Sequence, residues 1–299
     1  MAESFCAVGD IDLCYETIGD PADPAMLLIM GLGTQMLAWQ DEFCSALADR
    51  GFFVVRYDNR DVGRSTILGD AAVPTLGQIL RRDKRAASYT LAEMAADGVG
   101  VLDHLAIERA HVVGASMGGM IAQTIAIRFP HRVHSLVSIM SNTGHIWTGQ
   151  PALTMYGVLL KPAPRERDAY IERAVDVFTK IGGKGFAPDI EDLRDIASRS
   201  YDRGVNPAGS LRQLHAIVAD RDRTPHLKRL RVPTTVIHGA DDRLVRPSGG
   251  RATAKAIPGA RLVMIDGMGH GLPRGAWPRI LDAIVENAGR AQEPTPARG

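Results

Sequence analysis

The 299-residue sequence has few cysteines and almost no net charge. Its three cysteines, Cys6, Cys14 and Cys44, are odd in number and show no paired spacing, which argues against a disulfide framework and against a zinc site. We therefore expect no metal ion and a reducing compartment, the cytoplasm. The formal net charge of +1 gives no reason to expect nucleic acid or an anionic membrane as a partner.

Long apolar runs are missing as well. No segment approaches the roughly 20 uninterrupted apolar residues of a membrane-spanning helix. The first residues, MAESFCAVGD, contain no apolar stretch typical of a signal peptide. The sequence has no internal repeat and no low-complexity linker, and its densest basic run, residues 81–85, is interpreted as a solvated loop. What remains is the composition of an ordinary globular protein.

Short apolar runs alternate with helical patterns along the chain. We expect an N-terminal hairpin from FCAV and LCYETI, then strands at residues 25–30, 52–57, 110–114, 135–140, 234–239 and 261–266. Helices are expected at residues 36–50, 90–106, 117–128 and 276–288. Several strands are apolar throughout, as in central strands covered on both faces. The alternation predicts an α/β fold with a mostly parallel central sheet and helices on both faces.

The strand pattern stops between residues 146 and 227, where only helical patterns occur. We predict a helical cap over residues 146–227, inserted into a core formed by residues 1–145 and 228–299. Extra helices of the core are the alternative interpretation. Three aromatic or methionine residues of this segment are our candidates for lining a substrate pocket: Trp147, Met155 and Tyr156.

The stretch GASMGG, residues 114–119, places one serine among glycines between a predicted strand and a predicted helix. A phosphate-binding P-loop would need Lys and Ser or Thr after its last glycine, and a dinucleotide-binding loop would need glycine where Ser116 stands. The pattern fits G-x-S-x-G instead, a strained turn that exposes a nucleophilic serine. The helix that follows favours developing negative charge at its N-terminus. We therefore expect Ser116 to be a nucleophile.

A serine hydroxyl needs a base, and the base needs an orienting carboxylate. His270 is the candidate base, because it follows a predicted strand in the glycine-rich loop GMGHG. In the loop HGADDRLVRP, Asp241 and Asp242 are adjacent, so only one can face His270; the spacing G-x-x-D-x-x-V-x-P favours Asp242. Of the other histidines, His238 is expected to be buried in its strand, and His145 is kept as a candidate pocket residue.

Two backbone N–H groups are needed to stabilise the oxyanion of an acyl-transfer reaction. The N–H of Met117, directly after the serine, is the first candidate. The second is the N–H of Leu32, in the glycine-rich turn MGLG that follows the predicted strand at residues 25–30. Such a turn on its own is common and carries no chemistry, so this assignment depends on the serine.

Five landmarks, in this order, resemble the α/β-hydrolase superfamily over nearly the whole chain. They are MGLG at 30–33, YDNRDVGRS at 57–65, GASMGG at 114–119, HGADDRLVRP at 238–247 and GMGH at 267–270. The resemblance implies the α/β-hydrolase fold with a helical cap. Within the superfamily the chain is similar to aclacinomycin methylesterase-like proteins, on the stretches GDPADPA and RYD-x-RD-x-GRST and on methionines before the oxyanion glycine and after the serine.

This resemblance implies a serine esterase that cleaves carboxylic esters through an acyl-enzyme, without a metal or organic cofactor. The expected partner is an apolar small-molecule ester, with a methyl ester on a bulky substrate or a lipid-like ester as candidates. A thioesterase, a lipase or phospholipase, or a lactonase on the same triad is the alternative. A ligand-binding protein without hydrolytic activity is a further alternative, which the complete set of site residues disfavours.

Overall fold

The computed structural model describes residues 2–155, 157–158 and 164–291, and in this part of the chain eight strands form one sheet. The strands are β1 (Ser4–Val8), β2 (Ile11–Ile18), β3 (Ala25–Ile29), β4 (Phe53–Tyr57), β5 (Ala110–Ala115), β6 (Val133–Ile139), β7 (Thr234–Gly239) and β8 (Arg261–Ile265). Their order in the sheet is β1-β2-β4-β3-β5-β6-β7-β8. The β1–β2 and β2–β4 pairs are antiparallel, and all other pairs are parallel. The predicted fold class and the N-terminal hairpin are confirmed.

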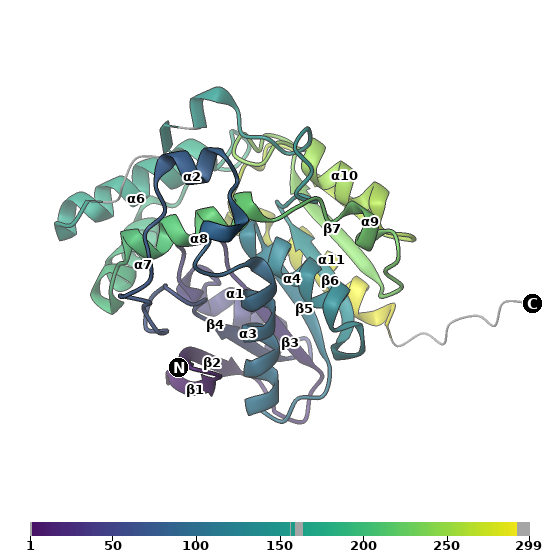
Figure 1. Ribbon diagram of the computed structural model, residues 1–299. Helices are drawn as coiled ribbons and strands as arrows, with labels where there is room; N and C mark the ends of the chain where they lie inside the picture. Colours follow the sequence, from purple (N-terminus) through teal and green to yellow (C-terminus); the bar gives the residue numbers. More distant parts are fainter. Residues whose placement is uncertain (1, 156, 159–163, 292–299) are drawn as a thin grey trace, which may run out of the picture.

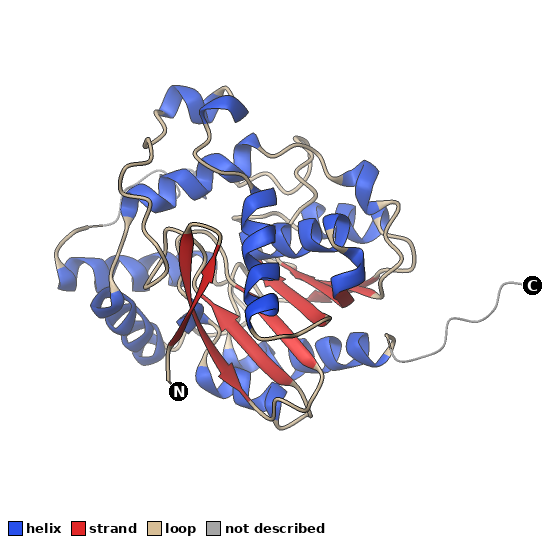
Figure 2. Ribbon diagram, turned by 60° about the horizontal axis from the view of Figure 1, so that its bottom comes forward, coloured by secondary structure: helices blue, strands red, loops and turns tan. Residues whose placement is uncertain are grey.

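Helices cover both faces of this sheet (Figure 2). One face carries α1 (Asp41–Ala48) and α11 (Trp277–Gly289), and the other carries α3 (Leu91–His104), α4 (Met117–Arg128) and α10 (Ser248–Ala256). Side chains alternate along a strand, so Leu27 of β3 belongs to the apolar core under α3 and α4, whereas Met26 belongs to the core under α1 and α11. The sheet is therefore buried on both sides, as the continuously apolar strands predict.

Local sequence explains where the helices begin and end. Helix α3 starts with the capping box that the sequence predicts: the Thr90 N–H donates to the Glu93 carboxylate at 2.8 Å. The prediction of one helix over residues 36–50 is wrong, because a 3-10 turn, η1 (Met36–Ala38), precedes α1. Between the two, the Trp39 carbonyl accepts a hydrogen bond from the buried Arg56 guanidinium of β4. That long-range contact is not visible in the local pattern.

The described residues between β6 and β7 form helices and no strand (Figure 1). They are η4 (Leu153–Met155), α6 (Arg167–Ile181), α7 (Ile190–Arg203), α8 (Pro207–Ala219) and α9 (Thr224–Leu227). We call α6, α7, α8 and α9 the cap helices, although the division of the chain into core and cap stays a prediction. Four short elements lie elsewhere: α2 (Leu76–Leu80), which packs beside α8, η2 (Lys84–Ala86), η3 (Pro130–Arg132) and η5 (Arg274–Ala276).

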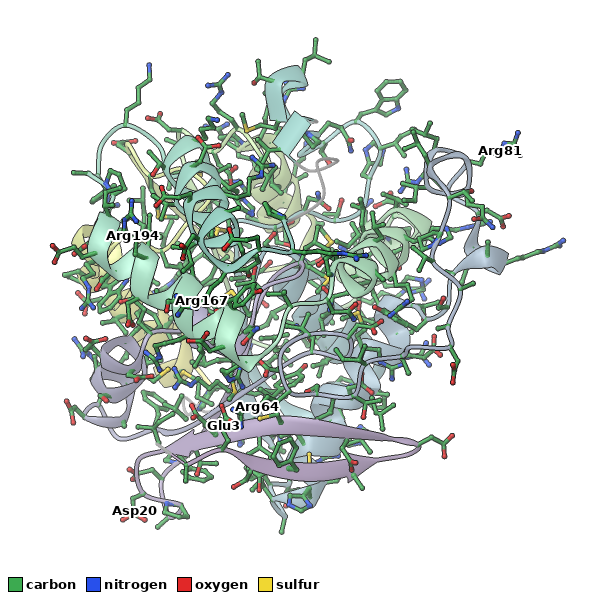
Figure 3. All side chains as sticks on the ribbon, turned by 90° about the vertical axis from the view of Figure 1, so that its left-hand side faces the viewer. Glu3, Asp20, Arg64, Arg81, Arg167 and Arg194 are labelled. Carbon is green, nitrogen blue, oxygen red and sulfur yellow. The ribbon has the colours of Figure 1, made fainter. Side chains whose placement is uncertain are left out.

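Ion pairs on the exposed side join α6 to α7. Arg167 and Asp202 approach to 3.0 Å, and Arg194 and Glu172 approach to 2.6 Å. Figure 3 shows Arg167 and Arg194 on this surface, and Arg81 projecting from the segment after α2. Such exposed pairs add little to stability, so the cap helices depend on their buried contacts with the core.

The described part of the chain contains no helix with the length and apolar character needed to cross a bilayer. All three cysteines are buried and unpaired.

Candidate active site

The loops that follow β3, β5, β7 and β8 meet at one edge of the sheet, because parallel strands end at the same edge. These loops contain Leu32, Ser116, Asp242 and His270, which are the residues that the sequence singles out. The structure brings the last three together in one hydrogen-bonded chain. Ser116 and His270, which contact each other directly, are 154 positions apart in the sequence.

Ser116 occupies a sharp turn between β5 and α4. Its φ of 57° and ψ of −119° lie outside the regions that non-glycine residues prefer. A Cβ atom on Gly114 would lie 2.0 Å from the Gly118 carbonyl oxygen, and one on Gly118 would lie 2.0 Å from the Ile29 carbonyl oxygen. Both positions therefore need glycine for steric reasons. The turn leaves Ser116 partly exposed at the N-terminus of α4.

Replacing Gly118 with alanine is expected to lower the free energy of unfolding by about 3 kcal/mol, because backbone atoms cannot yield to the added methyl group as a flexible side chain can. Gly289→Ala is the matched control, since a Cβ atom there meets nothing within 4 Å. It should be neutral or stabilising by about 0.5–1 kcal/mol. Urea denaturation measures both changes. Equal stabilities for the two variants would contradict the steric explanation of the turn.

His270 links the serine to a carboxylate. Its Nε2 lies 2.9 Å from Ser116 Oγ, and its Nδ1 lies 2.7 Å from Asp242 Oδ2. An ionised carboxylate only accepts hydrogen bonds, so Nδ1 carries a hydrogen and donates a hydrogen bond to Asp242. Nε2 is then free to accept the hydrogen bond of the serine hydroxyl. This is the arrangement in which an imidazole can remove a proton from serine.

The carboxylate of Asp242 is held in one orientation by its own loop. Its Oδ1 accepts the N–H groups of Leu244 at 2.9 Å and Val245 at 2.8 Å, which leaves Oδ2 for His270. Asp242 is buried, whereas Asp241 is exposed. Between the two adjacent aspartates that the sequence leaves open, the structure thus places Asp242 against the histidine.

His238 is buried behind this carboxylate. Its Nε2 donates to the Val245 carbonyl at 2.7 Å and lies 3.5 Å from Asp242 Oδ2. Burial holds the pKa of His238 below its ordinary value, although the negative charge of Asp242 opposes that shift. His238 therefore stays neutral at physiological pH.

The two candidate oxyanion donors come from two segments that lie close to Ser116. Met117 is the first residue of α4, and Leu32 follows Gly31, whose backbone is so close that an added Cβ would lie 3.1 Å from Ser116 Cβ. In the part of the chain that the structure describes, neither the Leu32 N–H nor the Met117 N–H donates a hydrogen bond to the protein. Both groups are therefore available to a negative charge that develops beside Ser116.

The candidate pocket residues differ in how far their side chains are exposed to solvent. Trp147 is 81% exposed and so forms little of an enclosed wall, whereas Met155 is buried. His145 is half-buried, and its Nδ1 accepts the Trp147 N–H at 3.3 Å. Tyr156 lies outside the described residues. Among the residues that are described, no cluster of three or more His, Cys, Asp or Glu side chains could hold a metal ion.

Sequence reasoning missed the side chains that hold the turn around Leu32. Asn59 Nδ2 donates to the Met30 carbonyl at 3.0 Å, and Gln213 Oε1 accepts the Gly33 N–H at 2.8 Å. Asn59 belongs to the landmark YDNRDVGRS, so that motif could have pointed to it. Gln213 lies in helix α8 and belongs to no motif, so no sequence signal identifies it.

Comparison with known proteins identifies the family of the chain. Residues 24–273 match the family described as alpha/beta hydrolase fold. The chain is 31% identical to a rhodomycin D methylesterase of Streptomyces peucetius, over 92% of this chain and 94% of that protein. It is 28% identical to a 3-oxoadipate enol-lactonase of Acinetobacter baylyi, over 86% of each chain. The crystal structure of a hydrolase from Pseudomonas aeruginosa superposes with a TM-score of 0.71 at 26% identity, covering 96% of this chain and 98% of the other.

Proposed function

The chain belongs to the α/β-hydrolase fold family and is a carboxylic ester hydrolase; from this premise we propose that Ser116, His270 and Asp242 form its catalytic triad. The observation that carries the proposal is the continuous chain from Ser116 Oγ through His270 to Asp242, with separations of 2.9 and 2.7 Å. A strained turn at Ser116 and two free N–H groups beside it support the same role.

The reaction proceeds in two steps of acyl transfer. Ser116 Oγ attacks the ester carbonyl while His270 Nε2 takes the hydroxyl proton, and the resulting oxyanion binds the N–H groups of Leu32 and Met117. Asp242 stabilises the imidazolium that forms. The bond to the alcohol then breaks, and His270 returns the proton to the leaving alkoxide. Water, activated by the same histidine, hydrolyses the acyl-enzyme and regenerates the serine.

We propose a methyl ester of a bulky, apolar carboxylic acid as the substrate class. The support is the similarity, at 31% identity over nearly the full length, to a protein named as a methylesterase. The small alcohol portion is the feature that distinguishes this class from lipid esters with a large alcohol portion. Three buried, unpaired cysteines support a reducing compartment, so the proposal places the protein in the cytoplasm.

Methyl and butyl esters of the same aromatic acid test the substrate class directly. We expect kcat/KM to favour the methyl ester by about tenfold or more, because a leaving-group site that fits one methyl group binds a butyl chain less well. A series of p-nitrophenyl esters, an acyl-CoA and a lactone serve as comparison substrates. A higher kcat/KM for palmitate esters, the acyl-CoA or the lactone would contradict the methyl ester and favour a lipase, thioesterase or lactonase. Binding without any turnover would contradict the enzyme itself.

A further inference from the structure

A buried side chain of the cap helices holds the turn that carries the Leu32 N–H. Gln213 lies on α8, 180 positions from Gly33, and its side chain has no exposed area. Its Oε1 accepts the Gly33 N–H at 2.8 Å, and its Nε2 donates to the Arg60 carbonyl at 2.9 Å. We propose that Gln213 is a positioning residue of the oxyanion hole, an inference that rests on the proposed function.

The bond from Gln213 fixes the peptide plane between Leu32 and Gly33. Residues 31–34 form a turn that is closed by the Thr34 N–H donating to the Gly31 carbonyl at 3.2 Å, with Gly33 at a φ of 62°. The central peptide of such a turn can rotate between turn types unless it is held. The Thr34 hydroxyl donates to the Leu32 carbonyl at 3.1 Å, and Gln213 accepts the N–H at the other end of that peptide. Both ends of the Leu32–Gly33 peptide are thus held. The Leu32 N–H belongs to the preceding peptide, so this restraint reaches it through the Cα atom of Leu32, which the two peptides share.

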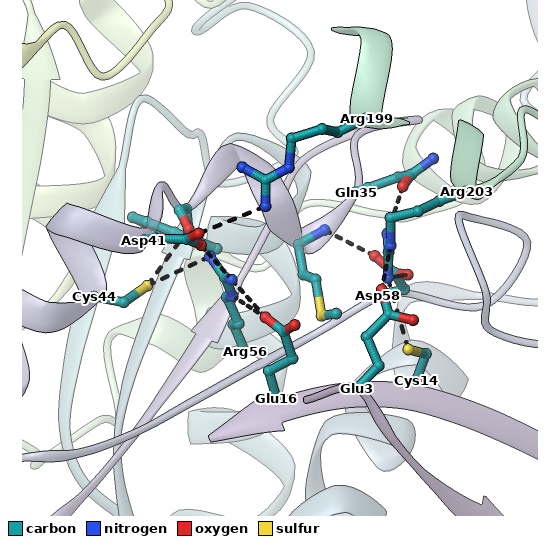
Figure 4. A network of polar contacts seen from close by, with 12 residues as sticks. Glu3, Cys14, Glu16, Gln35, Asp41, Cys44, Arg56, Asp58, Arg199 and Arg203 are labelled. Carbon is teal, nitrogen blue, oxygen red and sulfur yellow. Dashed lines mark hydrogen bonds and ion pairs between the residues drawn. The ribbon is translucent and has the colours of Figure 1, made fainter. Parts of the chain in front are cut away.

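A separate set of contacts anchors the residues after the turn to α7 (Figure 4). Gln35 Nε2 donates to the Ser200 carbonyl at 2.7 Å. Asp58 accepts the Met36 N–H at 2.8 Å and pairs with Arg203 at 2.7 Å. These contacts hold the loop in place without touching the Leu32–Gly33 peptide. Loss of Gln213 alone should therefore free that peptide and leave the loop docked.

The docking of α8 also has support other than Gln213. The neighbouring Arg212 forms a buried ion pair with Asp61, with two hydrogen bonds at 2.7 and 2.8 Å. The Asn206 side chain adds a hydrogen bond to the Asp61 carbonyl at 3.2 Å. A substitution of Gln213 is thus expected to disturb the turn at residues 31–34 more than it displaces α8.

The test is Gln213→Met, which keeps the length of the side chain and removes both hydrogen bonds. Gln123→Met is the matched control, because Gln123 is equally buried and also bonds through both ends of its carboxamide. Its partners are Ser138 at 3.0 Å and Arg223 at 3.2 Å, and neither belongs to the turn at residues 31–34. For each variant we would measure kcat and KM with a p-nitrophenyl ester, the inhibition constant of an aryl trifluoromethyl ketone, and the melting temperature. The ketone is chosen because its adduct with a serine places an oxyanion in the same hole as the reaction does.

Gln213→Met should lower kcat by about 10- to 100-fold and raise the inhibition constant of the trifluoromethyl ketone by a similar factor. The reason is that the Leu32 N–H is still present but no longer points at the oxyanion. KM should change by less than about threefold, since ground-state binding does not use the oxyanion. Gln123→Met should lower the melting temperature to a similar extent while kcat and inhibition stay near the wild-type values. A rise in KM with unchanged kcat would overturn the inference and assign Gln213 to substrate binding; equal kcat values in the two variants would overturn it as well.

A second variant keeps the inference testable if Gln213→Met does not fold. In Gln213→Glu a carboxylate oxygen still accepts the Gly33 N–H, whereas the donor to Arg60 is lost. We expect kcat to stay within about tenfold of wild type and inhibition by the ketone to be retained. A loss of kcat greater than that with the ketone still bound would overturn the inference. If the wild-type protein hydrolyses no ester, or if Ser116→Ala retains activity, the proposed function fails. If Ser116→Ala is inactive but Gln213→Met has the kcat of the wild type, only the positioning role of Gln213 fails.

Discussion

Replacing Ser116 with alanine is expected to lower kcat for ester hydrolysis by about ten thousand- to a millionfold, which is the range for removing the nucleophile of a serine triad. The hydroxyl is the atom that bonds to the carbonyl carbon, so no neighbouring group can replace it. The melting temperature should stay within about 2 °C, because the change removes one partly exposed oxygen and leaves the backbone turn as it is.

Ser141→Ala is the matched control for that variant. Ser141 is buried close to the same turn, where a Cβ on Gly119 would lie 2.9 Å from its hydroxyl, and this hydroxyl has no partner in the described part of the chain. Removing it should change kcat by less than about twofold. Steady-state hydrolysis of a p-nitrophenyl ester separates the two outcomes. Similar losses in both variants would mean that the turn, and not the nucleophile, is what the substitution disturbs.

Asp242→Asn is expected to lower kcat by about ten thousandfold at neutral pH. The backbone N–H groups of Leu244 and Val245 require an acceptor, so the asparagine oxygen takes the place of Oδ1 and its NH₂ group faces His270. An NH₂ group donates, and His270 Nδ1 must then accept. The proton moves to Nε2, and the histidine can no longer accept the proton of Ser116. The loss thus follows from the wrong tautomer and not from a displaced ring.

The adjacent aspartate provides the control. Asp241 is exposed, and its backbone N–H, not its side chain, contacts the histidine loop, at the Met268 carbonyl 2.9 Å away. Asp241→Asn should therefore keep kcat within about twofold of wild type. The two variants are compared by kcat and by NMR of the His270 ring protons. A large loss in Asp241→Asn together with an active Asp242→Asn would reverse the assignment that the loop geometry supports.

The fold could be predicted from the sequence because its signals are local. Continuously apolar runs mark buried parallel strands, and the Thr90–Glu93 capping box marks the start of α3. The turn at Ser116 can also be predicted, because the pattern G-x-S-x-G marks it. The glycines at 114 and 118 are required there, since an added Cβ atom at either position would lie 2.0 Å from a backbone oxygen. Each of these features depends on neighbours that are close in the sequence or on the regular geometry of a sheet.

The contacts that the sequence does not reveal join distant segments. The predicted helix over residues 36–50 is interrupted between η1 and α1, where Arg56 donates a hydrogen bond to the Trp39 carbonyl. Gln213 reaches Gly33 across 180 positions, from a helix whose pattern is that of an ordinary amphipathic segment. The choice of Asp242 over Asp241 also depends on two backbone N–H groups that orient the carboxylate, although the spacing of the loop favours the same residue. Such pairings are set by tertiary packing and have no local pattern.

Covalent labelling of the serine tests the central claim most directly. The wild-type protein would be treated with a fluorophosphonate, which traps an activated serine, and examined by intact mass and by mass spectrometry of tryptic peptides. The account predicts one adduct per chain, located in the peptide of residues 110–128, where Ser116 is the single serine, and absent from Ser116→Ala. Prior addition of a substrate ester should slow the labelling. Hydrolysis of esters by a protein that acquires no adduct there, or an adduct on another residue, would contradict the account.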